Sequence, residues 1–297
     1  MQVFIGLKAL LTIKNDPFLH PEHQNHPDHP VSSAIHLEIV QQIQAIEASH
    51  NITVLYACES GSRGWGFAST DSDYDVRFIY VHRLPWYVQV TLGRDVIKVP
   101  ISGDLDINGW ELRKALGLMK KGNATLLEWL DSPIVYRADA WFLGAMRAVA
   151  AQTHQVERSF YHYIHMARGN YREYLQGGSV RLKKYLYVLR PLLATLWIEQ
   201  GRGLVPIRFG ELVDGLVKDT ALRQAIDELL AHKRQALEAG CGKPWPVINT
   251  FIDTQLTRLE QAHPPAHQKI DFSVLDAVLL EAVLRHTALV VPQANSR

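Results

Sequence analysis

Cysteine is scarce in this chain of 297 residues, which contains only Cys58 and Cys241. Two cysteines in dissimilar contexts are too few for a disulfide framework, so the sequence favours a reducing compartment and predicts that both thiols are free. An excess of one charge is also lacking, because 31 Lys and Arg side chains are matched by 30 Asp and Glu side chains. No field of the whole protein therefore draws it onto nucleic acid or an anionic membrane, and any polyanion contact must be local.

Long apolar runs are absent as well. The first segment, residues 1–13, is apolar but short, and it carries Lys8 without a small-residue cleavage site. No later stretch approaches the ~18 uncharged apolar residues of a membrane helix. We therefore expect a cytoplasmic protein without a membrane partner. Hydrophobic residues nevertheless make up 47% of the chain, which is enough for a substantial core.

The pattern along the chain predicts three parts. Residues 1–32 are interrupted by four prolines and form an extended N-terminal arm. Residues 33–138 mix strands with helices, the strands being expected at 52–58, 74–81, 96–101 and 105–107 and the helices at 33–50, 110–121 and up to 130. Beyond residue 139 strand signals vanish, and amphipathic segments predict a helical C-terminal domain, residues 139–297. This order of elements indicates the α+β class.

Two aspartates at strand spacing carry the strongest chemical signal. Asp73 and Asp75 stand two apart in a segment of β-branched and aromatic residues, so both side chains should project from the same face. Carboxylates this close raise each other's pKa unless a cation lies between them. Hard oxygen ligands favour Mg²⁺ or Mn²⁺. We therefore expect these two residues to bind metal.

A two-metal phosphoryl-transfer site needs a third carboxylate. Asp106 is the preferred candidate because both of its neighbours in sequence are apolar, and Asp104 is the alternative. A glycine-rich turn, residues 61–66 (GSRGWG), supplies a cradle for phosphate. There Gly61 lets the backbone approach a triphosphate, Ser62 offers a hydroxyl and an amide, and Arg63 offers a forked guanidinium.

In this order, a glycine-serine turn, an Asp-x-Asp strand and a third carboxylate on a later strand match the signature of the polymerase-β nucleotidyltransferase superfamily. The motifs GSRGWGFAS and SDYDVR, with residues 106–116, 128–136 and 184–193, resemble the bacterial RNA-repair-pathway polymerase-β family, RlaP. The resemblance covers about residues 50 to 290 and leaves out residues 1–32. It implies a small mixed sheet that bears the three aspartates, joined to a helical domain that closes over the nucleotide.

The helical half contains one informative segment. Lys183, Tyr187 and Arg190 recur on one helical face with Lys184 close by, while leucines occupy another face. These residues could bind the triphosphate or an RNA backbone, with Tyr187 stacking on a base, or they could form an ordinary solvated face.

We therefore predict a metal-dependent nucleotidyltransferase. Two Mg²⁺ or Mn²⁺ ions, held by Asp73, Asp75 and Asp106, would help an acceptor hydroxyl attack the α-phosphate of a nucleoside triphosphate and expel pyrophosphate. The family points to an RNA end as the acceptor. The near-neutral net charge of the chain is also compatible with a small molecule or a protein hydroxyl as the acceptor. The alternative from another class is a nucleotide-binding regulatory module without turnover.

Overall fold

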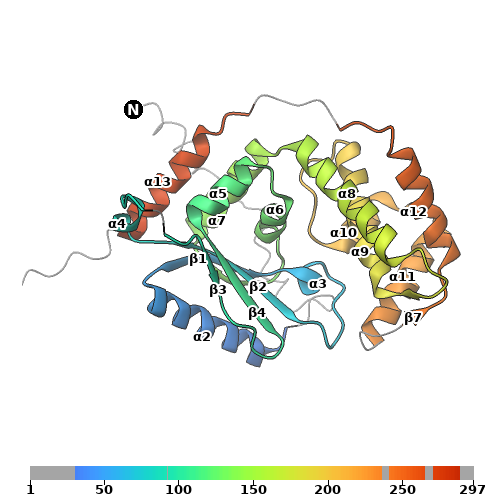
Figure 1. Cartoon of the computed structure of the whole chain (residues 1–297), viewed down its shortest axis with the longest axis horizontal. Helices are drawn as coiled ribbons and strands as arrows, with labels where there is room; N and C mark the ends of the chain where they lie inside the picture. Colours follow the sequence, from blue (N-terminus) through green and yellow to red (C-terminus); the bar gives the residue numbers. More distant parts are fainter. Residues whose placement is uncertain (1–30, 92, 236–240, 265–269, 288–297) are drawn as a thin grey trace, which may run out of the picture.

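A five-stranded mixed sheet organises the first half of the chain (Figure 1). The computed structural model describes residues 31–91, 93–235, 241–264 and 270–287, so the expected arm lies outside the described residues except for its last two. The strands follow the order β3-β4-β2-β1-β5, in which β2 and β4 pair in parallel and the other neighbours are antiparallel. Their bounds are β1 Thr53–Glu59, β2 Tyr74–Val81, β3 Val96–Lys98, β4 Leu105–Glu111 and β5 Val135–Ala138. The expected α+β class is confirmed.

One face of the sheet is covered by helix α2 (Ser33–His50). The helix begins where Ser32 Oγ accepts a hydrogen bond from the amide of Ile35, which satisfies a donor that the first turn leaves unpaired. Its isoleucines, spaced along one helical face, pack against alternate residues of β2, among them Val76 and Phe78. The period of two in the strand therefore sets which β2 side chains face α2 and which face the other side.

The opposite face of the sheet is covered by α5 (Leu112–Lys120), α6 (Ala124–Leu130), α7 (Ala140–Thr153) and α13 (Ser273–Thr287). These four helices share one hydrophobic cluster with residues of β1 and β2 such as Leu55 and Ile79. We expected residues 139–297 to form a single helical domain, but α7 and α13 pack on the sheet instead. Periodicity reveals that a helix has an apolar face without revealing which partner covers it.

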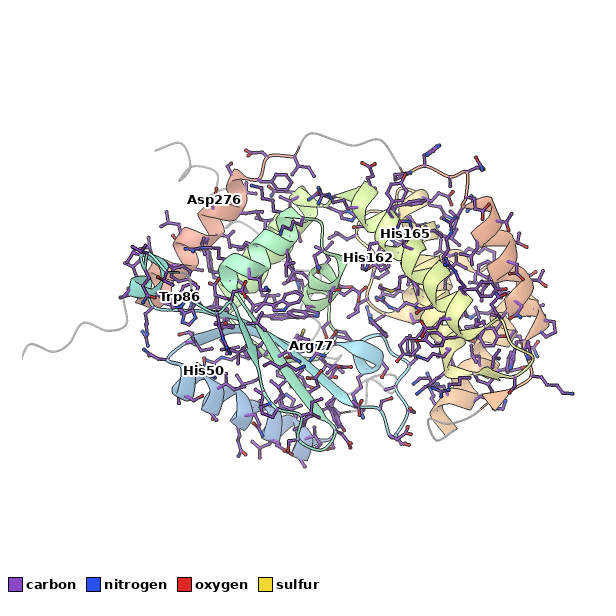
Figure 2. The ribbon with its side chains drawn as sticks, viewed as in Figure 1. His50, Arg77, Trp86, His162, His165 and Asp276 are labelled. Atoms are coloured by element: carbon purple, nitrogen blue, oxygen red, sulfur yellow. The ribbon has the colours of Figure 1, made fainter. Side chains whose placement is uncertain are left out.

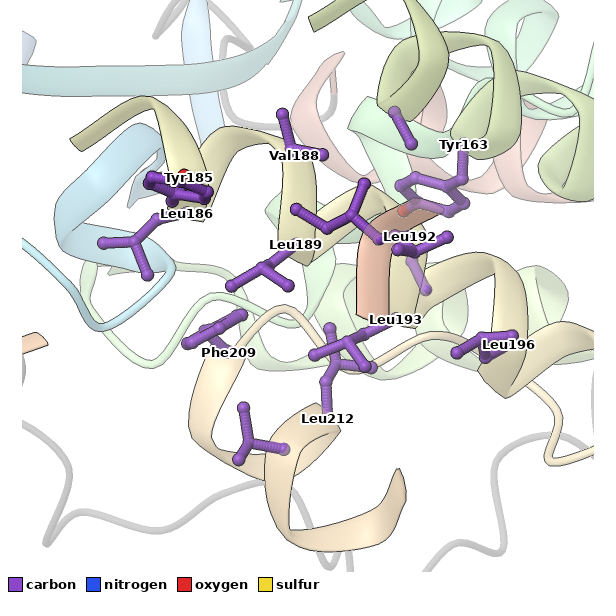
Figure 3. Close-up of a cluster of buried hydrophobic side chains, with 14 of the residues drawn as sticks. Tyr163, Tyr185, Leu186, Val188, Leu189, Leu192, Leu193, Leu196, Phe209 and Leu212 are labelled. Carbon is purple, nitrogen blue, oxygen red and sulfur yellow. The ribbon is translucent and has the colours of Figure 1, made fainter. Parts of the chain in front are cut away.

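The remaining helices gather beside the sheet around α9 (Figures 1 and 3). They are α8 (Val156–Tyr174), α9 (Lys183–Glu199), α10 (Phe209–Leu216), α11 (Thr220–Gln235) and α12 (Pro246–Arg258). Figure 3 shows leucines of α9, including Leu189 and Leu193, packed toward Phe209 and Leu212 of α10. Because α8, α10 and α12 all contact α9, most of its side chains are buried, and little of it remains to form a solvated face.

Pro191 lies inside α9 and cannot donate a hydrogen bond to the carbonyl of Tyr187. The side-chain amide of Asn170, on α8, donates to that carbonyl at 2.8 Å. The carbonyl that Pro191 leaves without its helical donor is thus satisfied by the neighbouring helix. Short elements complete the described structure, namely α3 Gly61–Gly64, α4 Leu84–Tyr87, β6 Val180–Arg181 and β7 Cys241–Gly242. Within the described residues, no helix has both the length and the apolar character needed to cross a membrane.

Candidate functional site

The parallel pairing of β2 with β4 places Asp75 directly opposite Asp106. Arg77, two residues after Asp75 and therefore on the same face, lies between the two carboxylates. One of its terminal nitrogens, Nη2, donates to Asp75 Oδ1 at 2.7 Å and to Asp106 Oδ2 at 2.8 Å. Figure 2 labels Arg77 on the sheet beside α3. Two of the three aspartates singled out by their spacing are therefore brought together, joined by a guanidinium.

The carboxylate of Asp75 is held in an environment that disfavours its charge. Burial raises its pKa most strongly, the positive charge of Arg77 opposes this, and the negative charges of Asp106 and Asp73 raise the pKa further. The side chains of Asp75 and Asp106 are only 31% and 26% exposed, whereas Asp73 is exposed. The site thus concentrates negative charge where water screens it only in part.

The structure shows which of the two candidates for the third carboxylate, Asp106 or Asp104, faces Asp75. Asp104 is exposed and precedes β4, and it contacts the neighbouring strand through its backbone carbonyl, which accepts a hydrogen bond from the amide of Tyr74 at 2.7 Å. The Asp106 carboxylate instead points to Arg77 and also accepts a hydrogen bond from Asn108 Nδ2 at 2.6 Å. Asp106 is therefore the carboxylate that meets Asp75.

The glycine-rich turn forms the short helix α3 at the edge of this acidic site. Gly61 has a φ of +56°, a conformation that side chains disfavour, and a Cβ placed on it would overlap Oδ2 of Asp75. The amide of Ser60 also donates to the carbonyl of Asp75 at 2.9 Å. Glycine is needed here because the turn lies directly against the carboxylate. Ser62, the predicted phosphate ligand, follows in the same turn and is half-buried.

Arg63 is placed differently from the sequence-based expectation of a phosphate-binding fork. It is 3% exposed, and its guanidinium donates to the backbone carbonyls of Ser72 at 2.6 Å and Asp73 at 3.2 Å. It also lies over the ring of Tyr74, 3.8 Å from the centroid. These contacts hold in place the segment that carries Asp73 and Asp75, so Arg63 has a structural role at the site. A buried environment for this arginine could not be deduced from its place in a glycine-rich turn.

Glu59, the last residue of β1, is a site residue that motif reading missed. It is fully buried, and its carboxylate accepts hydrogen bonds from the amide of Asp75 at 2.6 Å and from the hydroxyl of Tyr136 at 2.5 Å. Burial raises the pKa of Glu59 to about 7, against the effect of those hydrogen bonds. Its place at the end of an apolar strand, just before the glycine turn, was the available signal.

The N-terminal part of α9 approaches the glycine turn through aromatic contacts. Tyr187 packs edge-on against Trp65 in the turn and Phe67 just after it, with ring centroids 5.8 and 6.1 Å away. Lys184 Nζ lies 4.9 Å from the Tyr187 ring centroid, and Lys183 begins the helix. Lys183, Lys184 and Tyr187, three of the four residues of this segment that were predicted to bind nucleotide, are half-buried. The structure therefore brings Tyr187 of this helix end against the glycine turn.

Arg190 does not share the half-buried position of its neighbours. It is 2% exposed and forms an ion pair with Glu128 of α6, at 2.9 Å from Nη1 to Oε1. Glu128 also accepts hydrogen bonds from Tyr163 of α8 at 2.8 Å and from Trp65 at 3.1 Å. Arg190 is therefore a buried link between the helices and the turn rather than an exposed nucleotide ligand. The sequence did contain a hint, since Glu128 is a lone carboxylate in an apolar helix, where a buried charge needs a partner.

The arrangement can be compared with the requirements of a metal centre. Among the described residues, no group of three or more His, Cys, Asp or Glu side chains is placed so that it could hold a metal ion. The guanidinium of Arg77 occupies the space between Asp75 and Asp106, which is where their negative charge calls for a cation. The donor chemistry fits a hard divalent ion, because carboxylate oxygens are what Mg²⁺ and Mn²⁺ prefer. The three aspartates as they stand are not an assembled ligand set.

The sequence of the chain is also similar to those of known proteins. The sequence pattern of the RlaP family, described as the RNA repair pathway DNA polymerase beta family, matches residues 35–281. The chain is 45% identical over 247 residues to the uncharacterized protein YcgL of Bacillus subtilis (strain 168), covering 82% of this chain and 95% of that protein. A solved structure of a nucleotidyltransferase-like protein from Exiguobacterium sibiricum 255-15 aligns with 83% of this chain and 76% of that chain. Its identity is 12% and its TM-score 0.27, too low a likeness to inform function.

Proposed function

We propose that this chain, which belongs to the RNA repair pathway DNA polymerase beta family, transfers a nucleoside monophosphate from a triphosphate to an acceptor hydroxyl and releases pyrophosphate. The family match agrees with the resemblance seen in the motifs. The single observation that carries the proposal is the register of Asp75 with Asp106 beside Gly61. This register puts two carboxylates of neighbouring strands beside the glycine-rich turn.

In the proposed reaction, Asp73, Asp75 and Asp106 would hold the Mg²⁺ or Mn²⁺ ions. Such ions stabilise charge on the entering and leaving oxygens of an in-line phosphoryl displacement. The protein's own part is positioning. Glu59 orients the backbone of Asp75, and the turn that starts at Gly61 offers the hydroxyl and amide of Ser62 to phosphate oxygens.

The N-terminal part of α9 supplies the cations of the proposed nucleotide site. Lys183 and Lys184 lie in the first turn of the helix, whose N-terminus itself attracts anions. The packing of Tyr187 against Trp65 keeps this helix end beside the glycine turn. We assign these residues to the polyphosphate tail, and we assign Arg63 and Arg190 to supporting roles because both are buried.

The test is to incubate the full chain with each α-labelled nucleoside triphosphate, Mg²⁺ or Mn²⁺, and separate acceptors. The acceptors are an RNA oligonucleotide with free ends, a small-molecule polyol and the protein itself. We expect label on the RNA together with release of pyrophosphate, because the family description points to RNA repair. Asp106→Ala should abolish both signals. The matched control is Asp104→Ala, which removes an exposed carboxylate two residues away and should leave both signals intact.

A second function is favoured by one observation. Arg77 forms ion pairs with Asp75 and Asp106 and so neutralises part of the negative charge that metal ions would need. This arrangement is compatible with a protein that binds nucleotide without turnover. Saturable binding of triphosphate without any metal-dependent release of pyrophosphate, with all acceptors present, would establish this regulatory module and refute the transferase. Label on the polyol or on the protein would keep the transferase and change its acceptor.

A further inference from the structure

Arg77 is held in place more firmly than a surface arginine. Besides its bonds to the two carboxylates, its second terminal nitrogen, Nη1, donates to the backbone carbonyl of Asp106 at 2.8 Å and to that of Val76 at 3.1 Å. The side chain is 16% exposed. Four hydrogen bonds therefore fix the guanidinium across the seam between β2 and β4, with its charge between Asp75 and Asp106.

This position has a consequence for cations that come from solution. A divalent ion held by Asp75 and Asp106 would lie within a few ångströms of a fixed positive charge, and like charges so close repel strongly where solvent screening is partial. The guanidinium also occupies oxygens, Asp75 Oδ1 and Asp106 Oδ2, that would serve as ligands.

We propose that Arg77 is a positioning residue that acts as a built-in counter-cation. It keeps Asp75 and Asp106 aligned, and it keeps their affinity for divalent metal low until a nucleoside triphosphate binds. The phosphate oxygens of the nucleotide then offer the guanidinium other anionic partners in the forked geometry that arginine favours. Metal and nucleotide therefore bind as coupled ligands, each raising the affinity of the other. This inference rests on the proposed function, because it takes the aspartates as the metal ligands.

The test is to measure Mn²⁺ affinity of the nucleotide-free full chain by titration calorimetry and by the paramagnetic signal of free Mn²⁺. Arg77→Gln keeps a hydrogen-bond donor but removes the charge, and it should bind Mn²⁺ about tenfold to a hundredfold more tightly than the wild type. Arg77→Lys keeps the charge, and its affinity should stay within about threefold of the wild type. Asn108→Ala is the matched control, because it removes a neutral donor to the same carboxylate at 2.6 Å and should also stay within about threefold.

A nucleotide analogue that resists transfer gives the second measurement. With the analogue bound, the difference in Mn²⁺ affinity between the wild type and Arg77→Gln should shrink to less than about threefold, because the phosphates take over the guanidinium. Arg77→Met provides a second uncharged side chain if the glutamine variant does not fold, as judged by urea denaturation. Unchanged or weaker Mn²⁺ binding in the uncharged variants, or equal tightening in Arg77→Lys, would overturn the inference.

A double variant distinguishes the counter-cation role of Arg77 from the proposed metal site itself. In the Arg77→Gln background, Asp106→Ala should abolish the tightened Mn²⁺ binding. Tight binding that survives this second change would place the metal elsewhere and overturn the proposed site together with the role of Arg77. An unchanged affinity in Arg77→Gln alone, with nucleotide transfer still dependent on Asp106, would remove only the counter-cation role.

Discussion

Replacing Arg190 by methionine should destabilise the folded protein strongly. The variant would leave the side chain of Glu128 in the interior with the hydroxyl of Tyr163 and the indole of Trp65 as hydrogen-bond donors but without its positively charged partner. It would also remove both hydrogen bonds from the guanidinium to the carbonyl of Ile207, each 3.3 Å long. Removing one partner of a buried ion pair costs about 3–5 kcal/mol. We expect the free energy of unfolding, measured by urea denaturation, to fall by that amount.

Two further variants make this prediction decisive. The double variant Arg190→Met with Glu128→Met should be more stable than Arg190→Met alone, because an apolar pair no longer leaves a charge uncompensated. The control is Arg258→Met, which breaks a two-bond ion pair with Glu199 whose arginine side chain is 46% exposed. That loss should be about 1 kcal/mol or less. If Arg190→Met cost no more than Arg258→Met, the Glu128 pair would not be the buried link that we describe.

Three other predictions concern a turn, a titration and a helix. Gly61→Ala should reduce nucleotide transfer at least tenfold in the pyrophosphate assay, because its Cβ would overlap a site carboxylate. Gly103→Ala, with a φ of +58° but no atom within 4 Å of its Cβ, should show only backbone strain of about 1 kcal/mol and retain transfer. Burial raises the pKa of Asp131 from 3.8 to about 6, so the folded state holds this proton more tightly than the unfolded state. The contribution of Asp131 to stability is therefore greatest below about pH 4 and declines by up to about 3 kcal/mol as the pH rises to about 6. In urea denaturation measured at a series of pH values, Asp131→Asn should remove that decline. Asn170→Ala should cost about 1–2 kcal/mol, because the half-buried carbonyl of Tyr187 loses its donor. The same change in a Pro191→Ala background should cost less than about 0.5 kcal/mol, since alanine restores the helical amide. Equal costs in the two backgrounds would contradict the role given to Asn170.

Local spacing predicted the elements that carry the site. The strand at residues 74–81 has the predicted bounds, and Asp75 and Arg77 share one face because successive strand side chains alternate. The last predicted strand begins at Leu105 as expected but runs on to Glu111, longer than the predicted 105–107. Helix α10 (Phe209–Leu216) and strand β5 (Val135–Ala138) were not anticipated, because each is too short to show a clear period.

The sequence by itself determined which residues share a face, because the repeats of strand and helix are properties of a few consecutive residues. It therefore placed Asp75 and Arg77 on one face of a strand, singled out the glycine turn before them, and preferred Asp106 over Asp104 as the third carboxylate. Only the tertiary structure decided what those faces meet, since β2 and β4 pair across a gap in sequence and helices find partners through packing. That is why the burial of Arg63 and Arg190, the support from Glu59 and the placing of Arg77 between two carboxylates became visible only in three dimensions.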